Sequence, residues 1–313
     1  MESRLKTAPW WFDLSAALVR RLPAGRYVAM RNLCRYPVPP FLARLLGSRS
    51  GLKFECDVRN ELAREAYFMG HYEPQETCLL HTLLGPGDTF VDVGANWGYF
   101  SLLATERVGA SGRVVSVEAD PRMFSILQRN VAMNALPQVT LVPAAAAAGP
   151  GTLKLAGFDE EQSNWGISRV VSGGGGKVFE VPAKAVDDLA DELGLGSVDL
   201  LKMDIEGAEV FALAGMERGL ASHRYKRILL ELHPVQLAEH GTTADAVCAR
   251  LIQAGYTGWR VRHSREDTRR AAYARSLTAA DVLVPARPGE PLDEWPHVLW
   301  MAPGVPAPWA ASA

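Results

Sequence analysis

Short apolar runs alternate with amphipathic segments along the chain from residue 85 onward. Five of these runs have the length and the branched apolar content of buried strands, at residues 89–93, 113–118, 139–142, 199–203 and 228–232. Segments of helical periodicity separate them and start near residues 99, 121 and 207. Strands that alternate with helices build a parallel sheet with helices on both faces. The pattern therefore predicts an α/β fold with a Rossmann-like parallel-core sheet.

A stretch without this alternation lies between the third and fourth predicted strands. Residues 153–155 and 177–181 have the polar–apolar alternation of half-exposed strands, and residues 173–176 are four consecutive glycines. These glycines lack the basic and hydroxyl neighbours of a phosphate-binding loop. We interpret the stretch as a hairpin whose tip is the glycine run.

The first 60 residues are rich in arginine, proline and aromatic residues. Apolar residues recur there at helical spacing at Leu14, Ala17, Leu18 and Leu22. This spacing predicts one amphipathic helix, which Pro23 and Gly25 would end. We expect residues 1–60 to be a mostly helical extension and residues 61–313 to be the main domain. The helix either covers part of that domain, which we favour, or binds a membrane surface.

Composition and charge are those of an ordinary globular protein and indicate which partners are not expected. The chain has 313 residues, of which 48% are hydrophobic and 22% charged, as in ordinary globular proteins. Its net charge of −2 exerts no global attraction on nucleic acid. We find no apolar stretch near the ~18 residues that a membrane span needs, and no secretory signal. We therefore expect neither a nucleic-acid partner nor stable membrane insertion.

The cysteines indicate the compartment. Cys34, Cys56, Cys78 and Cys248 lie far apart, and none belongs to a C-x-x-C pair. This spacing argues against a zinc site or a disulfide framework and fits a reducing cytoplasm. The expected localisation is cytoplasmic, and the oligomeric state stays open.

The turn after the first predicted strand has the features of a nucleoside site. In an open α/β sheet, ligands bind beyond the carboxyl ends of the strands. Here Gly94 removes a Cβ that would block a ligand, and Gly98 lets the helix start close to the sheet. Glu118 follows 20 residues after Gly98, at the end of the second strand. Its carboxylate can accept hydrogen bonds from both hydroxyls of a ribose.

The glycine spacing distinguishes between nucleoside cofactors. A dinucleotide fold uses G-x-G-x-x-G, whose second glycine lets the backbone approach a pyrophosphate. Here the pattern is G-x-x-x-G, with Asn96 at the position of that second glycine. A cofactor with a ribose but no phosphate fits better, and S-adenosylmethionine meets that description, with Asp92 available for its ammonium group. A NAD-linked oxidoreductase is the alternative that this step leaves open.

Several motifs together resemble a known family. They are DVGANWGYFS at 92–101, EADP at 118–121, LKMDIEGAE at 201–209 and ELHP at 231–234, preceded by GHYEP at 70–74. Over about residues 60–240 the chain resembles the FkbM family of S-adenosylmethionine-dependent methyltransferases, most distinctively in K-x-D-x-E-G-x-E. The resemblance implies the class I methyltransferase fold. It also implies methyl transfer to hydroxyl oxygens of sugars, polyketides and other secondary metabolites.

Spacing and resemblance together define the expected site. Cofactor contacts are expected from Asp92, Gly94, Asn96, Gly98, Tyr99, Glu118 and Ala119. Substrate contacts are expected from Tyr72, Glu73, Asn164, Glu206 and Glu231. We expect no metal, because two carboxylates at Asp204 and Glu206, without further ligands at clear spacing, do not define a metal site.

Polar residues near the ends of two later strands are candidates for catalysis. Lys202 and Asp204 are two residues apart on a strand and therefore point to the same face. A buried lysine needs a partner, and we expect Lys202 to pair with Glu231. His233 is the first candidate for the base that deprotonates an acceptor, because an unperturbed histidine is largely neutral at pH 7. Asp204 is the alternative base.

An arginine-rich segment at residues 259–275 lies outside the resemblance. It is either a solvated helix face, which we favour, or a grip on a phosphorylated or carboxylated acceptor.

The sequence thus predicts an enzyme that transfers a methyl group from S-adenosylmethionine to a hydroxyl oxygen of a small molecule, by in-line displacement. The partner is a small hydroxylated acceptor, and secondary metabolism is its expected setting. The alternatives are methylation of an amine or carboxylate, a NAD-linked oxidoreductase, and a cofactor-binding scaffold without catalysis.

Overall fold

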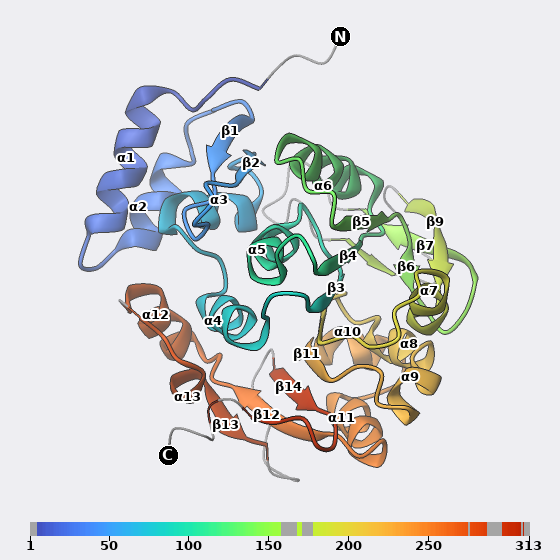
Figure 1. Cartoon of the computed structure of the whole chain (residues 1–313). Coiled ribbons are helices and arrows are strands. Elements are labelled where there is room, and N and C mark those ends of the chain that lie inside the picture. The colour runs from blue at the N-terminus through green and yellow to red at the C-terminus, as the bar shows by residue number, and fades with distance from the viewer. Residues whose placement is uncertain are drawn as a thin grey trace.

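An eight-stranded mixed sheet forms the centre of the protein (Figure 1). The computed structural model describes residues 5–157, 168–170, 178–274, 276–286, 296–307 and 309. The strands, in their order across the sheet, are β13 (Leu283–Pro285), β12 (Thr257–Val261), β14 (His297–Met301), β11 (Arg227–Glu231), β10 (Leu200–Met203), β3 (Thr89–Val93), β4 (Arg113–Val117) and β5 (Val139–Val142).

The five predicted strands are confirmed as the parallel part of this sheet. They are β11, β10, β3, β4 and β5, and every neighbouring pair among them is parallel. The three remaining strands, β14, β12 and β13, continue the sheet beyond β11 in antiparallel pairing. Because the parallel strands run in register, their carboxyl ends meet at one edge of the sheet, where ligands bind in open α/β folds.

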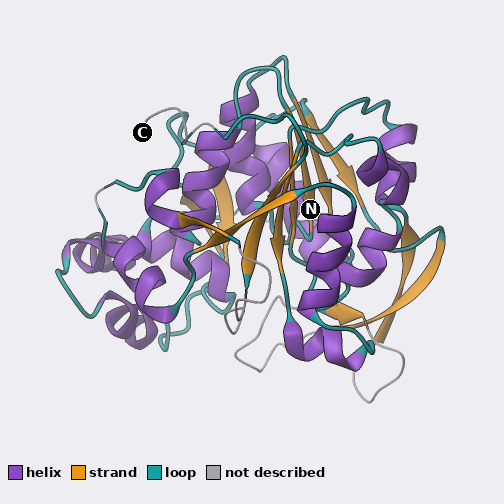
Figure 2. Cartoon of the chain, turned by 90° about the horizontal axis from the view of Figure 1, so that it is seen from below, coloured by secondary structure: helices purple, strands orange, loops and turns teal. Residues whose placement is uncertain are grey.

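Helices cover both faces of the sheet, as predicted (Figure 2). On one face, α4 (Pro74–Leu83) and α5 (Tyr99–Val108) share a core with Phe90 and Val114. On the other face, α7 (Val186–Glu192), α8 (Glu209–Ala214) and α11 (Ala244–Gln253) share a core with Val91 and Val115. The remaining helices of this region are α6 (Pro121–Met133), α9 (Glu217–Ala221), α10 (Pro234–Glu239), α12 (Arg265–Tyr273) and α13 (Ala279–Val282).

The first part of the chain packs against the same core. It contains α1 (Trp10–Arg21), α2 (Arg26–Leu33), the antiparallel pair β1 (Phe41–Arg44) and β2 (Lys53–Cys56), and α3 (Glu61–Met69). Phe12 of α1 is fully buried, with its ring 5.9 Å from that of Phe41 and 5.2 Å from that of Phe68. Side chains from residues 5–60 and from the sheet therefore form one continuous hydrophobic cluster.

The predicted helix near the N-terminus is present, but the apolar residues that predicted it are not the ones that it buries. The residues that α1 buries are Phe12, Ala16 and Val19. Leu14 and Leu18, which set the predicted periodicity, are exposed. Both faces of α1 are apolar, so periodicity identified the helix but could not decide which face meets the core.

A second sheet of four strands covers the edge beyond β5. Its order is β6-β9-β7-β8, with β6 (Ala145–Ala146), β9 (Val178–Lys184), β7 (Gly151–Ala156) and β8 (Arg169–Val170). The predicted pairing of residues 153–155 with 177–181 is confirmed by the antiparallel register of β7 and β9, in which Leu153 faces Val181. The short strand β8 also pairs with β7, and the glycine run at 173–176 lies outside the described residues.

Two further sequence expectations concern the chain as a whole. The four cysteines are free. Among the described residues, no helix combines the length and the apolar character that crossing a membrane requires.

Gly94 and Gly98 both permit close packing of chain segments. At Gly94 the backbone is left-handed, with φ of 86°, and a Cβ would lie 1.9 Å from the carbonyl oxygen of Asp204. The Asp204 amide in turn donates to the carbonyl of Val93 at 3.0 Å. A Cβ at Gly98 would lie 2.6 Å from Leu127 of α6. The loops after β3 and β10 are thus held together by backbone contact.

Gly94→Ala should destabilise the protein by about 3 kcal/mol, because the new Cβ meets backbone atoms and a left-handed alanine is strained. Urea denaturation measures the free energy of unfolding. Gly196→Ala is the matched control, since a Cβ there meets nothing within 4 Å. A Gly94 variant as stable as this control would contradict the packing argument.

Candidate active site

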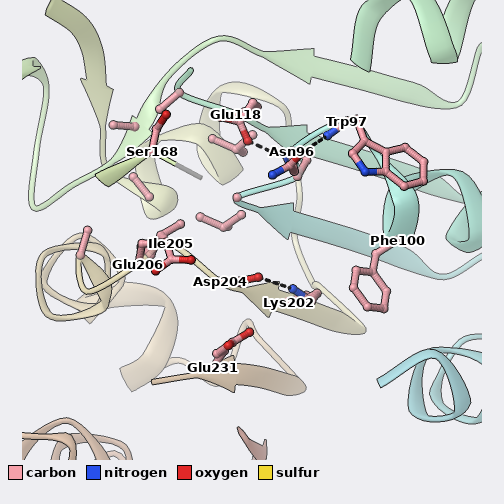
Figure 3. Close-up of a pocket in the computed structure, with 18 of the residues that line it drawn as sticks. Asn96, Trp97, Phe100, Glu118, Ser168, Lys202, Asp204, Ile205, Glu206 and Glu231 are labelled. Atoms are coloured by element: carbon pink, nitrogen blue, oxygen red, sulfur yellow. Dashed lines mark hydrogen bonds and ion pairs between the residues drawn. The ribbon is translucent and has the colours of Figure 1, made fainter. Parts of the chain in front are cut away.

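A cavity of about 140 Å³ opens at the carboxyl ends of the parallel strands (Figure 3). The loop after β3 contributes residues 94–97 to its wall, and β4 is followed there by Glu118 and Ala119. Residues 204–206 after β10 and Glu231 at the end of β11 complete the polar part. A cavity therefore lies where the sequence analysis places the site, beyond the parallel strands.

Glu118 is held by the backbone on one wall of the cavity. Its Oε2 accepts from the amide of Asn96 and its Oε1 from the amide of Asp120, each at 2.7 Å. Burial raises the pKa of Glu118 to about 7, although the two amides oppose that shift. Each carboxylate oxygen can accept more than one hydrogen bond, so Glu118 keeps acceptor capacity for a ligand.

Lys202 pairs with Asp204 rather than with Glu231, which corrects the predicted ion pair. Its Nζ lies 3.3 Å from Asp204 Oδ2 and 4.6 Å from the ring centre of Phe100. Burial alone would lower the pKa of Lys202, but the surrounding carboxylates, with Asp204 first, raise it. Lys202 and Asp204 do point to the same face, as their spacing predicts, and both line the cavity.

His233 lies behind the cavity wall. Its Nε2 is 3.5 Å from Glu206, 3.5 Å from Glu231 and 3.8 Å from Asp204. Its Nδ1 donates to Glu209 Oε1 at 2.8 Å, and Glu209 is itself fully buried. His233 thus stands at the centre of a group of carboxylates, three of which reach the cavity.

The protonation state of His233 differs from the sequence-based premise. Burial alone would lower its pKa, but the hydrogen bond to Glu209 and the neighbouring carboxylates raise it to about 10. The imidazole is therefore protonated at neutral pH, whereas a histidine near its ordinary value would be largely neutral. The reason for preferring His233 as the base is wrong, because the sequence does not show how many carboxylates converge on it.

Glu206 combines an unusual backbone with a shifted pKa. It follows Asp204 by two residues, lines the cavity and has a left-handed φ of 53°. Burial raises its pKa to about 7, and the charge of His233 opposes the rise. A carboxyl group that titrates near neutral pH is suited to proton transfer.

Glu231 is linked through His297 to a third residue, Glu76, which is buried. The sequence analysis identified neither His297 nor Glu76. His297 on β14 places Nε2 3.4 Å from Glu231 Oε1, and its Nδ1 is 2.9 Å from Glu76 Oε1 on α4. Burial alone would raise the pKa of Glu231, but His297, His233 and Lys202 lower it. His297 precedes the apolar run 298–301, and this strand pattern was the signal that could have placed it beside β11.

The expected cofactor residues divide into two groups. Those that line the cavity are Gly94, Asn96, Tyr99, Glu118 and Ala119. Neither Asp92 nor Gly98 is among the described residues that line the cavity. The Asp92 carboxylate accepts from Ser101 Oγ at 2.6 Å and is buried, and its contact with the ammonium group stays a prediction.

The expected substrate residues divide in the same way. Tyr72, Glu206 and Glu231 line the cavity. Glu73, at the start of α4, is not part of the described lining, although one of its oxygens lies within 4.8 Å of ligand atoms of Asp204 and Glu231. Asn164 lies outside the described residues.

Three groups of side chains in the described part of the chain bring metal-type donor atoms within 4.8 Å of one another. They are Glu76 with His263 and His297, Asp204 with Glu206 and His233, and Glu73 with Asp204 and Glu231. Ion pairs join His297 to Glu76 in the first group and His233 to Asp204 and Glu206 in the second, whereas the third group consists of three carboxylates. That the site needs no metal stays a prediction.

The arginine-rich segment lies away from the cavity. Arg265, Arg269 and Arg270 are exposed on α12, and Arg270 forms an ion pair with Glu266 one helical turn away. Among the described residues, none from 259 to 274 lines the cavity. Exposure on a helix agrees with the favoured interpretation for these three arginines.

Comparison with known families decides what kind of domain this is. The profile described as "Methyltransferase FkbM domain" matches residues 92–257, just over half of the chain. The chain belongs to the FkbM methyltransferase family. Its matched region is an S-adenosylmethionine-dependent methyltransferase domain, which overturns the NAD-linked alternative and confirms the resemblance seen in the motifs.

Two curated proteins are similar to parts of this FkbM chain. Methyltransferase sdnD from Sordaria araneosa is 32% identical over 161 residues, which cover 42% of this chain and 62% of the relative. An arsenite methyltransferase from Halobacterium salinarum is 39% identical over 51 residues, or 16% of this chain and 13% of the relative. The chain thus matches less than two thirds of the length of either relative.

Solved structures of low sequence identity also align. A methyltransferase FkbM from Methylobacillus flagellatus KT aligns over 92% of this chain and 60% of its own, with 16% identity and a TM-score of 0.41. Aeropyrum pernix fibrillarin, solved with natively bound S-adenosyl-L-methionine, aligns over 73% of this chain and 76% of its own, with 12% identity and a TM-score of 0.41.

The cavity of the FkbM domain fits its cofactor, S-adenosylmethionine. The Glu118 carboxylate, anchored by two amides, would hold the ribose hydroxyls. Ala119, Ala145 and Leu155 also line the cavity and would form an apolar wall for the adenine ring. Asn96 stands where a dinucleotide would need a bare backbone, and its left-handed φ of 53° fixes the turn.

Glu118→Gln should weaken S-adenosylmethionine binding by about tenfold or more, since a charged acceptor is replaced by a neutral one of the same shape. In the unaltered protein, affinity should fall as pH drops below about 7, because the carboxylate, whose pKa is about 7, becomes protonated. The variant should show a weaker dependence. Titration calorimetry with the cofactor and its demethylated product measures both.

The matched control is Glu180→Gln, an exposed carboxylate on β9, which should bind the cofactor normally. Equal affinity of the two variants would remove Glu118 from the ribose site.

Proposed function

We propose that this FkbM protein transfers a methyl group from S-adenosylmethionine to a hydroxyl oxygen of a small molecule, with Asp204 as the base. The observation that carries the proposal is the position of Asp204. It lines the cavity directly beside Gly94 of the cofactor loop, with Lys202 and His233 on either side of its carboxylate.

The cofactor supplies an activated methyl group on a sulfonium, so the protein mainly has to position an acceptor oxygen in line with it. A base adds about 10²–10⁴-fold by taking the hydroxyl proton. Asp204 Oδ1 is the acceptor atom we propose, because Oδ2 is engaged by Lys202 at 3.3 Å. Lys202 and His233, both cationic at neutral pH, hold the carboxylate in place.

The same geometry gives the other polar residues supporting roles. Glu231 and Tyr72 line the cavity and would contact the acceptor. His233 acts through the carboxylates that it contacts and is a positioning residue, since it is 3% exposed and lies behind the wall. Trp97 and Phe100 also line the cavity, and their rings would exclude water from the acceptor.

The acceptor class is tested by product chemistry. The purified protein is incubated with S-adenosylmethionine and panels of hydroxylated, amino and carboxylic small molecules, and products are identified by mass spectrometry. Ethers that resist alkaline hydrolysis support the proposal. Alkali-labile esters or basic N-methyl products would replace it with the corresponding alternative, and binding of the cofactor without turnover of any acceptor would favour a scaffold.

Asp204→Asn should lower kcat by about 10²-fold or more while leaving cofactor affinity nearly unchanged, because the base is lost and the shape is kept. Glu206→Gln is the comparison, since Glu206 shares the wall and should affect KM more than kcat. The rate of each variant is measured against pH. A larger kcat loss in Glu206→Gln, together with loss of a rate transition near pH 7, would assign the base to Glu206, whose pKa is about 7.

Removal of metal should leave turnover unchanged. Nearby cations already compensate the carboxylates of the cavity, with Lys202 3.3 Å from Asp204 and His297 3.4 Å from Glu231. The enzyme is dialysed against EDTA and assayed with and without added Mg²⁺ or Mn²⁺. Activity that disappears and is restored by one of these ions would show a metal site among the carboxylates.

A further inference from the structure

The face of α1 that points away from the core is a continuous apolar row. Trp10, Leu14, Leu18 and Leu22 follow one another at intervals of four residues, so they lie along one side of the helix and its C-cap. They are 78%, 52%, 53% and 37% exposed, respectively. Scattered exposed apolar residues are normal on a protein surface, but a contiguous row marks an interaction site.

Neighbouring aromatic residues widen this row into a surface. Trp11, which is 38% exposed, places its ring 6.2 Å from that of Tyr36, which is 61% exposed. We call the row together with Trp11 and Tyr36 the outer strip. The opposite side of α1 is also apolar and is buried in the core, so the helix has apolar residues on two faces and protein covers one of them.

Arginines lie beside the outer strip on α1 and next to Tyr36 in the sequence, and they form its basic border. The first 36 residues contain seven arginines and lysines and two acidic residues, a net charge of +5 against −2 for the whole chain. The rest of the chain therefore carries −7. Arg21, Arg31 and Arg35 are exposed, and Arg21 follows Leu18 by three positions, on the same side of the helix. Asp13 is exposed and accepts a hydrogen bond from the hydroxyl of Tyr67 at 2.5 Å.

The combination of exposed apolar residues with arginines indicates which kind of surface could cover the outer strip. A second copy of the chain, related by a two-fold axis, would bring the same basic border against itself, and like charges repel. An anionic lipid surface matches both parts, because tryptophan and leucine insert at the level of the headgroups while arginine contacts their negative charge. The first 36 residues are positive and the rest of the chain is negative. An anionic surface would therefore attract the end that carries α1 and repel the remainder.

We propose that α1 docks this protein peripherally on an anionic membrane through the outer strip and its arginines. Figure 1 shows α1 and α2 together at the outer edge of the molecule, with α1 outermost, so a flat surface can approach this side. The helix would lie in the plane of the interface and would not span the membrane. The proposal is independent of the base and of the acceptor.

The test uses the full chain and lipid vesicles. The protein is mixed with vesicles of phosphatidylcholine alone, or of phosphatidylcholine with phosphatidylglycerol, and separated by flotation. Binding is expected to the vesicles that contain phosphatidylglycerol, and to weaken as salt increases. The double variant Leu14→Ser/Leu18→Ser should bind at least tenfold more weakly.

A matched control removes exposed apolar residues elsewhere. Val235 and Ile252 are 73% and 51% exposed on α10 and α11, two helices that Figure 1 shows well apart from α1. Val235→Ser/Ile252→Ser should bind vesicles like the unaltered protein. Circular dichroism and cofactor binding should be unchanged in both double variants, since the four side chains lie outside the core.

Three results would overturn the proposal. One is absence of binding to vesicles with phosphatidylglycerol. Another is equal binding to both vesicle types, or equal loss of binding in both double variants. The third is a dimer in sedimentation analysis that Leu14→Ser/Leu18→Ser dissociates, without vesicle binding by the unaltered protein. This last result would assign the strip to a second copy of the chain.

Discussion

The active site depends on the burial of opposite charges beside one another at a single edge of the sheet. Lys202 and His233 provide the positive charges nearest the cavity, and Asp204, Glu206 and Glu231 surround them. An unpaired buried charge is costly, so each group holds its neighbour in place. The arrangement keeps His233 protonated and lowers the pKa of Glu231, while the pKa of Glu206 is about 7. The same ion pairs therefore set the protonation states of these side chains and hold the side chains in place.

The parallel sheet makes this concentration of charge available to a ligand. Parallel strands in register end together, so the side chains that follow β3, β4, β10 and β11 meet around one cavity. Backbone contact between Gly94 and Asp204 sets how closely the cofactor loop approaches the proposed base. His297 brings the antiparallel strand β14 into the network through Glu231, which extends the site beyond the parallel core.

The surface of the molecule shows a second, separate constraint. Residues 5–60 share a core with the sheet through Phe12 and its aromatic neighbours. The same helix presents tryptophan and leucine outward beside arginine, in a chain whose remainder is negative. One end of the protein therefore combines apolar and basic character, while the cavity gathers carboxylates.

The sequence by itself determined the features that local periodicity and short motifs carry. It predicted the five parallel strands, the helices after them, the pairing of β7 with β9, the cofactor and the family. Only the tertiary structure decided which face of α1 is buried, because both faces are apolar and burial depends on what packs against them. It likewise decided that Lys202 pairs with Asp204, that Asp92 bonds to Ser101, and that His233 is protonated. Such properties arise from charges that are distant in sequence and close in space, which no local pattern records.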